Sequence, residues 1–246
     1  YLLILGIMAA FFARTFAMGV NRFADRKFDA KNPRTASRPS VDGRVSATTQ
    51  LVVITACAVG FIAVSFAINE LAFALSFAFL PILAAYSYFK RFSSAAHLVL
   101  GLSLALAPIA GEIAVSESIS AWSVLLALGV LFWVAGFDIF YALQDMEFDK
   151  KEGLYSIPSV FGEKASLNFA AAFHTLTVLF WFLFIGYADL SMISMSAVAV
   201  AAVLLGYEHF LVRRDSGAIN KAFFTVNGYL GILFFALVGV DIWIHQ

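Results

Sequence analysis

The sequence predicts an all-α fold, a polytopic bundle of transmembrane helices, on two observations. Of the 246 residues, 62% are hydrophobic and only 13% are charged, whereas a typical soluble domain is about half apolar and about a quarter charged. Apolar stretches of about 18 residues or more, long enough to cross a bilayer as a helix, recur along the whole chain. No linker or low-complexity tract separates them, so residues 1–246 are expected to form a single integral membrane domain.

Eight membrane-spanning helices are expected. The apolar stretches that predict them cover approximately residues 1–22, 48–69, 71–89, 95–116, 121–144, 165–187, 190–212 and 222–244. Glycine and alanine are frequent within these stretches, as close packing of helices in lipid requires. The positions of Pro81 and Pro108 are the only ones where proline interrupts a stretch, so most of these helices are expected to be unbroken.

Basic residues distinguish the two ends of this bundle. Arg14 lies inside the first span, and the other Lys and Arg residues all lie at or beyond the ends of the odd-numbered spans. The opposite connections carry none, so the basic side is expected to face the cytoplasm of a bacterial cell, in a multi-pass protein of the inner membrane. The chain begins inside an apolar run with no methionine and no charged leader, so we expect a further segment before Tyr1.

A polar stripe runs along the first span to its basic end. Asn21, Asp25 and Asp29 follow one another at four-residue spacing, which places them on one face of a helix. Arg14 precedes Asn21 by seven residues, about two helical turns, and continues the stripe into the membrane. Charged groups are costly in hydrocarbon and therefore indicate function. The alternative is an amphipathic helix end whose acids pair with neighbouring bases, but it leaves Arg14 unexplained.

A second polar stripe ends the fifth span, in the segment GFDIFYALQDMEFDKKEG. Asp138, Tyr141, Asp145 and Asp149 fall on one helical face there. The two acidic pairs, Asp25 with Asp29 and Asp145 with Asp149, are 120 residues apart in sequence. Four membrane crossings separate the spans that carry them, so both pairs are expected to emerge on the same side.

Four carboxylates that face one another repel unless cations are present. Mg²⁺ prefers a few carboxylates together with substrate phosphates, and basic side chains nearby would bind the phosphate oxygens. The candidate bases are Arg26, Arg34, Arg38, Lys90 and Arg91. The sequence therefore predicts a site for a diphosphate at the mouth of a lipid-embedded bundle, so the other part of the substrate is expected to be a lipid tail.

At these residues the sequence resembles the UbiA superfamily of intramembrane aromatic prenyltransferases. The resemblance rests on NRFADRKFD followed by RTASRP, and on YALQDMEFD; it extends through YSYFKRFSSAAHLVLG and NKAFFTVNGYLG, and so covers essentially the whole chain. It is closest to the 4-hydroxybenzoate polyprenyltransferases and to their relatives in the futalosine route to menaquinone, thought to act on a dihydroxynaphthoate. The stretches DAKNPRTASRPSVDGR and LQDMEFDKKEGLYSIPSVFG look most like the second branch.

The resemblance implies a UbiA-like bundle of nine helices in which the first aspartate motif ends the second helix. Eight spans are present here, so one helix is expected before Tyr1. It also implies transfer of a polyprenyl group from a polyprenyl diphosphate to an aromatic acid in ubiquinone or menaquinone biosynthesis. Mg²⁺ would be the cofactor, held by Asn21, Asp25 and Asp29 on one side and by Asp145 and Asp149 on the other.

The remaining site residues follow from the same implied reaction. Asp25, Asp145, Tyr141 and Lys90 are the candidate catalytic residues, with Tyr141 presenting its ring to the allylic cation. Arg34, Arg38, Lys90 and Arg91 would neutralise the leaving diphosphate, and Arg26 would join them in binding it. Arg14 is the candidate partner of an acceptor carboxylate. Asp138 either pairs with Arg14 or orients the acceptor hydroxyl, and Asn227 either lines the cavity or packs helices together.

An ion-coupled membrane transporter is the main alternative, because transporters also place acids at membrane depth. Here the acids cluster beside bases at one surface, which favours the enzyme. Of the other charges at membrane depth, Glu112 and Asp241 lie near the outer ends of spans and are expected to reach water. Glu208 and His174 are expected to make helix contacts. The sequence contains no nucleotide-binding loop and no motif for nucleic acid, and no obligate protein partner is evident.

Overall fold

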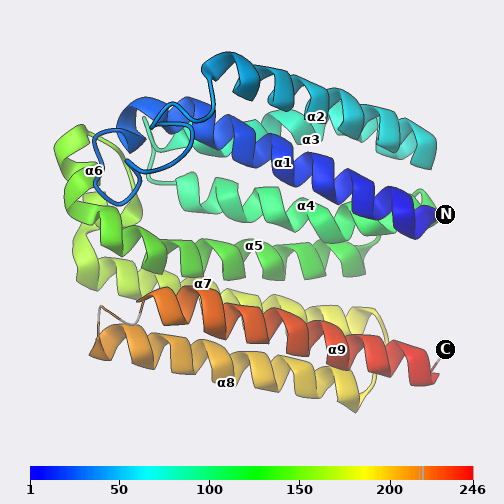
Figure 1. Ribbon diagram of the computed structural model, residues 1–246. Helices are drawn as coiled ribbons and strands as arrows, with labels where there is room; N and C mark the ends of the chain where they lie inside the picture. The colour runs from blue at the N-terminus through cyan, green and yellow to red at the C-terminus, as the bar shows by residue number, and fades with distance from the viewer. Residues whose placement is uncertain (216, 218, 246) are drawn as a thin grey trace.

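The computed structural model describes residues 1–215, 217 and 219–245, and the regular structure in these residues is entirely helical. Long helices run side by side between the two ends of the molecule, and both termini lie at the same end (Figure 1). The elements are α1 (Leu2–Asp29), α2 (Ala47–Ile68), α3 (Glu70–Phe89), α4 (Ala96–Ser116), α5 (Ala121–Ala142), η1 (Leu143–Asp145), α6 (Met146–Glu152), α7 (Ile157–Tyr187), α8 (Met192–Arg214), the π-helical η3 (Lys221–Val226) and α9 (Asn227–His245).

Eight helical segments within this described part are long and apolar enough to cross a membrane. They match the eight expected spans in order, which confirms the predicted fold class. The two halves of the bundle meet along α4 and α5, with α1–α3 on one side and α7–α9 on the other (Figure 1). Gly101 makes the contact between α4 and α5 possible, because a Cβ atom there would lie 2.2 Å from the carbonyl oxygen of Leu131.

Two helix boundaries differ from the sequence expectation. The first helix extends to Asp29, so both acids of the first pair are helical. The sixth span begins at Ile157 rather than near residue 165. Ser156 caps it, since its hydroxyl accepts a hydrogen bond from the Ser159 N–H at 3.2 Å while the Ser159 hydroxyl accepts one from the Ser156 N–H at 2.8 Å. A kink at Gly162, with φ of 79°, then separates this first turn from the rest of α7.

Two buried carboxylates fix helices at the end that carries the termini. The Glu112 carboxylate accepts a hydrogen bond from the N–H of Ser120, the N-cap of α5, at 2.9 Å. Asp241 accepts one from the N–H of Ser191, the N-cap of α8, also at 2.9 Å. An anion at a helix N-terminus is stabilised by the helix dipole and by the unpaired N–H groups. Glu112 is 7% exposed and Asp241 1% exposed, so the expectation that they reach water is wrong.

A second polar cluster joins α5, α8 and the start of α9. Asn227 accepts a hydrogen bond from the Trp133 indole N–H at 2.6 Å. Its amide donates to the Glu208 carboxylate at 2.9 Å and to the carbonyl of Ala222 at 3.2 Å. Asn227 therefore makes the contacts of a helix-packing residue, one of the two alternatives that the sequence left open for it.

Candidate active site

Both acidic pairs line one cavity of about 320 Å³ at the end of the bundle opposite the termini. Its walls come from the end of α1 and the loop that follows, from the α3–α4 connection, and from the segment that runs from α5 to the start of α7. Its polar lining residues are Asn21, Asp25, Asp29, Asn32, Arg34, Thr35, Arg38, Tyr86, Lys90, His97, Asp138, Tyr141, Asp145, Asp149, Tyr155 and Ser156. The arrangement expected from the sequence, two acidic ladders facing a shared space, is present.

The first acidic ladder is held by bases from two other segments. Asp25 is only 3% exposed, and its Oδ2 accepts hydrogen bonds from Lys90 Nζ at 2.6 Å and from the Asn21 amide at 3.2 Å. Both oxygens of Asp29 contact Arg38 Nη1 at 2.7 Å. These ion pairs are partly buried, so water screens them less than it would a surface pair.

The second acidic ladder is bonded to the loop that follows α1. Arg34 donates to Asp145 through both Nε and Nη2, and Asn32 donates to the same carboxylate at 3.0 Å. Arg34 Nη1 also donates to the Tyr141 hydroxyl at 2.6 Å. Burial alone would lower the pKa of the Arg34 guanidinium, but the hydrogen bonds and charges of Asp145 and Tyr141 outweigh it and raise the pKa. Arg34 therefore stays charged and links the loop after α1 to the second ladder.

The segment between α6 and α7 closes the cavity. The Ser156 hydroxyl donates to Asp149 at 2.9 Å, and the N–H of Tyr155 donates to the carbonyl of Lys90 at 2.6 Å. The N–H of Ile157, two residues further along the chain, donates to His97 Nε2 at 3.1 Å. This short segment thus contacts the second ladder, the α3–α4 connection and α4.

Four residues expected to bind substrate lie outside the lining of this cavity. Arg14 is exposed on α1, Arg26 is partly buried, and Asn227 belongs to the cluster described above. Arg91 donates to the carbonyl of Ala24 at 2.7 Å and so joins the end of α3 to α1. Substrate-binding roles for these four remain predictions.

Asp138 lines the cavity, but its hydrogen-bond partner was not anticipated. The structure pairs it with His97, at 2.7 Å, rather than with Arg14. His97 begins α4, 41 residues away in sequence, so no local pattern indicates this contact. Sequence reasoning also missed Asn32 and Ser156. Ser156 carried a signal, because a serine followed by proline within two residues is a typical start of a helix.

The site residues fit a divalent cation that is carried by a phosphate. No three carboxylate, histidine or cysteine side chains in the described ranges lie close enough to hold a metal ion alone. The Asp25 Oδ1 atom, however, is buried and has no hydrogen-bond partner in this part of the chain. Mg²⁺ commonly binds one or two carboxylates and completes its shell with water and substrate phosphates. Asn21, Asp25 and the other ladder acids offer such an incomplete set of oxygen ligands.

The comparisons with known proteins agree with this geometry. A model described as the UbiA prenyltransferase family matches residues 1–238. The 4-hydroxybenzoate octaprenyltransferase of Aeromonas hydrophila is 30% identical over 240 residues, which cover 97% of this chain and 83% of that protein. The protein of the same name from Enterobacter sp. strain 638 is 33% identical over 229 residues, which cover 91% of this chain and 77% of that protein.

Solved structures show the same likeness. The apo structure of a UbiA homolog from Aeropyrum pernix K1 has a TM-score of 0.89 and 31% identity, and the match covers 97% of this chain and 89% of that one. A UbiA homolog from Archaeoglobus fulgidus bound to GPP and Mg²⁺ has a TM-score of 0.75 at 22% identity, a likeness of fold, over 96% of this chain and 87% of that one. With eight apolar spans and two acidic ladders on one cavity, the chain belongs to the UbiA prenyltransferase family.

Proposed function

We propose that this integral membrane protein transfers a polyprenyl group from a polyprenyl diphosphate to an aromatic acid of the 4-hydroxybenzoate type, with Mg²⁺. The observation that carries the proposal is the single cavity in which both acidic ladders and three bases meet. The curated relatives are named for octaprenyl transfer to 4-hydroxybenzoate. The Archaeoglobus homolog binds a prenyl diphosphate together with Mg²⁺. The basic end, where the cavity opens, faces the cytoplasm in this proposal.

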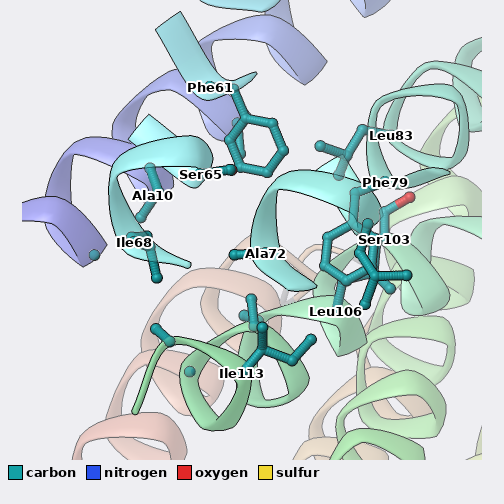
Figure 2. A pocket seen from close by; sticks show the side chains of 18 residues that line it. Ala10, Phe61, Ser65, Ile68, Ala72, Phe79, Leu83, Ser103, Leu106 and Ile113 are labelled. Carbon is teal, nitrogen blue, oxygen red and sulfur yellow. The ribbon is translucent and has the colours of Figure 1, made fainter. Parts of the chain in front are cut away.

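An apolar cavity next to the polar one provides space for the prenyl tail. Its volume is about 250 Å³, and α1, α2, α3 and α4 line it. In Figure 2 the side chains of Phe61, Ala72, Phe79 and Ile113 surround this space. On α3, Leu83 lines the apolar cavity and Tyr86 lines the polar one, so less than one helical turn separates the two linings. The tail would lie in the apolar cavity and the diphosphate in the polar one.

The chain's own residues account for the charge changes of the reaction. Lys90, Arg34 and Arg38 would exchange their carboxylate partners for phosphate oxygens and stabilise the diphosphate as it leaves. Mg²⁺, held by Asn21, Asp25 and Asp29 and by Asp145 and Asp149, would supply further stabilisation of that negative charge. The Tyr141 ring lies one turn from Asp145 and would face the positive charge that develops on the allylic carbon. The apolar walls would keep water from that carbon.

One assay tests the proposed function. The purified protein in lipid vesicles is given a labelled polyprenyl diphosphate, Mg²⁺ and either 4-hydroxybenzoate or a dihydroxynaphthoate. We expect a prenylated 4-hydroxybenzoate and an equal amount of diphosphate, both abolished by EDTA. If only the dihydroxynaphthoate gave a product, the acceptor would be a naphthoate and not 4-hydroxybenzoate. No Mg²⁺-dependent diphosphate release with any aromatic acid would reject the enzyme, and ion flux coupled to a solute would then favour the transporter.

The role of the apolar cavity predicts a change in chain-length preference. Replacing Ala72 with phenylalanine should raise the KM for a long polyprenyl diphosphate by about tenfold, because overpacking an apolar site costs about 1–3 kcal/mol. The KM for dimethylallyl diphosphate should change little, since its tail does not reach this depth. Ala74→Phe, on an exposed face of the same helix, is the matched control. An equal effect on both donors would place the tail elsewhere.

A further inference from the structure

Asp138 differs from the ladder acids in what it contacts. Asp25, Asp29 and Asp145 each contact a lysine or arginine. In the described part of the chain, Asp138 is hydrogen-bonded to His97, whose side chain is 4% exposed. The Asp138 side chain is 13% exposed, and the residue lines the polar cavity. One carboxylate of the cavity is therefore held by a histidine and accessible from the cavity.

The hydrogen bonds of His97 fix the position of its proton. The Ile157 N–H donates to Nε2 at 3.1 Å, so Nε2 carries a lone pair. In the neutral ring, Nδ1 then carries the hydrogen and donates it to Asp138 Oδ2 at 2.7 Å. This tautomer is assigned from the hydrogen-bond network. Because both ring nitrogens are engaged, His97 cannot itself accept a proton from a substrate, and Asp138 keeps its second oxygen, Oδ1, for another partner.

The depth of Asp138 places it away from the diphosphate. Asp138 lies on α5 and precedes Asp145, the last residue of η1, by seven residues, which is about 10 Å along the helix axis. Tyr141 lies between them, one turn from each. Tyr86 on α3 and Ala96 and Leu100 on α4 line the same cavity. If the diphosphate lies between the ladders, the allylic carbon bonded to it lies on its membrane side, in the direction of Asp138, and the aromatic acceptor would approach from there.

We propose that Asp138 is the proton acceptor for the phenolic hydroxyl of the aromatic substrate, and that His97 is the residue that positions it. This inference rests on the proposed function and assigns a residue to its second step, the attack of the aromatic acceptor on the allylic carbon. As the allylic C–O bond breaks, its electron pair leaves with the diphosphate. The ring carbon ortho to the hydroxyl forms the new C–C bond, and the hydroxyl proton passes to Asp138 Oδ1. The resulting dienone loses its ring proton to solvent, and Asp138 returns its proton to the oxygen.

The other titratable groups that line the cavity have other roles in the proposed reaction or differ in chemistry. Asp25, on α1, is paired with Lys90 and would help to hold the cation, and Asp149 accepts a hydrogen bond from the Ser156 hydroxyl. Tyr86 on α3 is a phenol and, near neutral pH, is a poor acceptor of a phenolic proton. General bases contribute about 10²- to 10⁴-fold to a rate, so loss of this one is measurable.

Asp138→Asn tests the assignment with little change of shape. Its side-chain oxygen can still accept the His97 hydrogen, but it cannot accept a proton. Two rates are measured: prenyl transfer to 4-hydroxybenzoate, and diphosphate release without acceptor. We expect the ratio of transfer to release to fall at least about 100-fold in Asp138→Asn, whereas Asp145→Asn lowers both rates. The loss should be smaller with 3-fluoro-4-hydroxybenzoate, whose more acidic phenol needs less help from a base.

Two substitutions of His97 separate positioning from packing. Asn at this position keeps a donor near Nδ1 and loses the acceptor for Ile157, whereas Gln keeps an acceptor near Nε2 and loses the donor to Asp138. We expect His97→Gln to lower the transfer-to-release ratio more than His97→Asn, with the same relief by the fluorinated acceptor. The opposite order would make His97 a packing residue.

Failure of this inference can be told from failure of the proposed function. If the parent protein transfers the prenyl group and Asp138→Asn keeps the parent ratio, the proton acceptor is another group. The same conclusion follows if Asp138→Asn lowers the transfer-to-release ratio equally with 4-hydroxybenzoate and with its 3-fluoro derivative. If the parent releases no diphosphate with any phenol, the proposed function falls and this inference falls with it. Should Asp138→Asn fail to fold, the His97 pair gives the same test.

Discussion

Replacing Asp25 with asparagine should lower the rate of prenyl transfer by about 100- to 1,000-fold. Asp25 is buried, it contacts Lys90, and its Oδ1 is the one ladder oxygen buried without a partner in the described residues. In the proposed reaction that carboxylate helps to hold the cation that stabilises the departing diphosphate, and removing one such preorganised group typically costs this much. The measurement is kcat for transfer at saturating donor, with the dependence on Mg²⁺ concentration recorded for both proteins.

Asp42→Asn is the matched control for this substitution. Asp42 lies in the loop after α1, and its side chain is 32% exposed and paired with Arg44. Asp42 is absent from the cavity lining, so the Asp42→Asn variant should transfer the prenyl group at nearly the parent rate. If Asp25→Asn and Asp42→Asn behaved alike, the first ladder would not hold the cation.

Replacing Gly101 with alanine should destabilise the folded bundle, although it adds only one methyl group. The new Cβ would lie 2.2 Å from the Leu131 carbonyl oxygen, which belongs to the backbone of α5 and cannot rotate away. Relief requires α4 and α5 to separate along the contact that joins the two halves of the bundle. Overpacking of this kind costs about 1–3 kcal/mol and sometimes more, so we expect a fall in melting temperature of several degrees in detergent.

Gly111→Ala, two to three turns along the same helix, controls for the change of residue type. A Cβ atom at Gly111 meets nothing within 4 Å, and alanine has the higher helix propensity. This variant should melt at or above the parent temperature. Equal melting of the two variants would show that α4 and α5 are not held this closely in the membrane-extracted protein.

The sequence predicts the spans and the two acidic ladders because both depend on local periodicity. Asp25 and Asp29 share a helix face, as do Asp145 and Asp149, and any α-helix would show it. The partners of these acids depend on the packing of separate helices. Lys90 is 65 residues from Asp25, and Arg34 is 111 residues from Asp145. No local pattern pairs residues this far apart. The sequence therefore predicts that these bases belong to the site, but not which carboxylate each of them contacts.

The close approach at Gly101 is a similar case. Nothing distinguishes Gly101 from Gly111 in sequence, since both lie in the same apolar span. Only the position of α5 shows that Gly101 lies against a neighbouring backbone, whereas Gly111 faces open space. The contacts of His97 likewise depend on Asp138 and Ile157, which belong to other helices.

The hydrogen bonds from Arg34 to Asp145 have a consequence for affinity. The loop after α1 holds this guanidinium on a carboxylate that would bind the cation in the proposed reaction, so Arg34 would compete with the incoming cation at a high effective concentration. Substrate loading is then an exchange of partners rather than the filling of a vacant space. If the proposed reaction holds, a protein without Arg34 would take up divalent ions more readily and would turn over more slowly, because the same side chain would afterwards bind the phosphate.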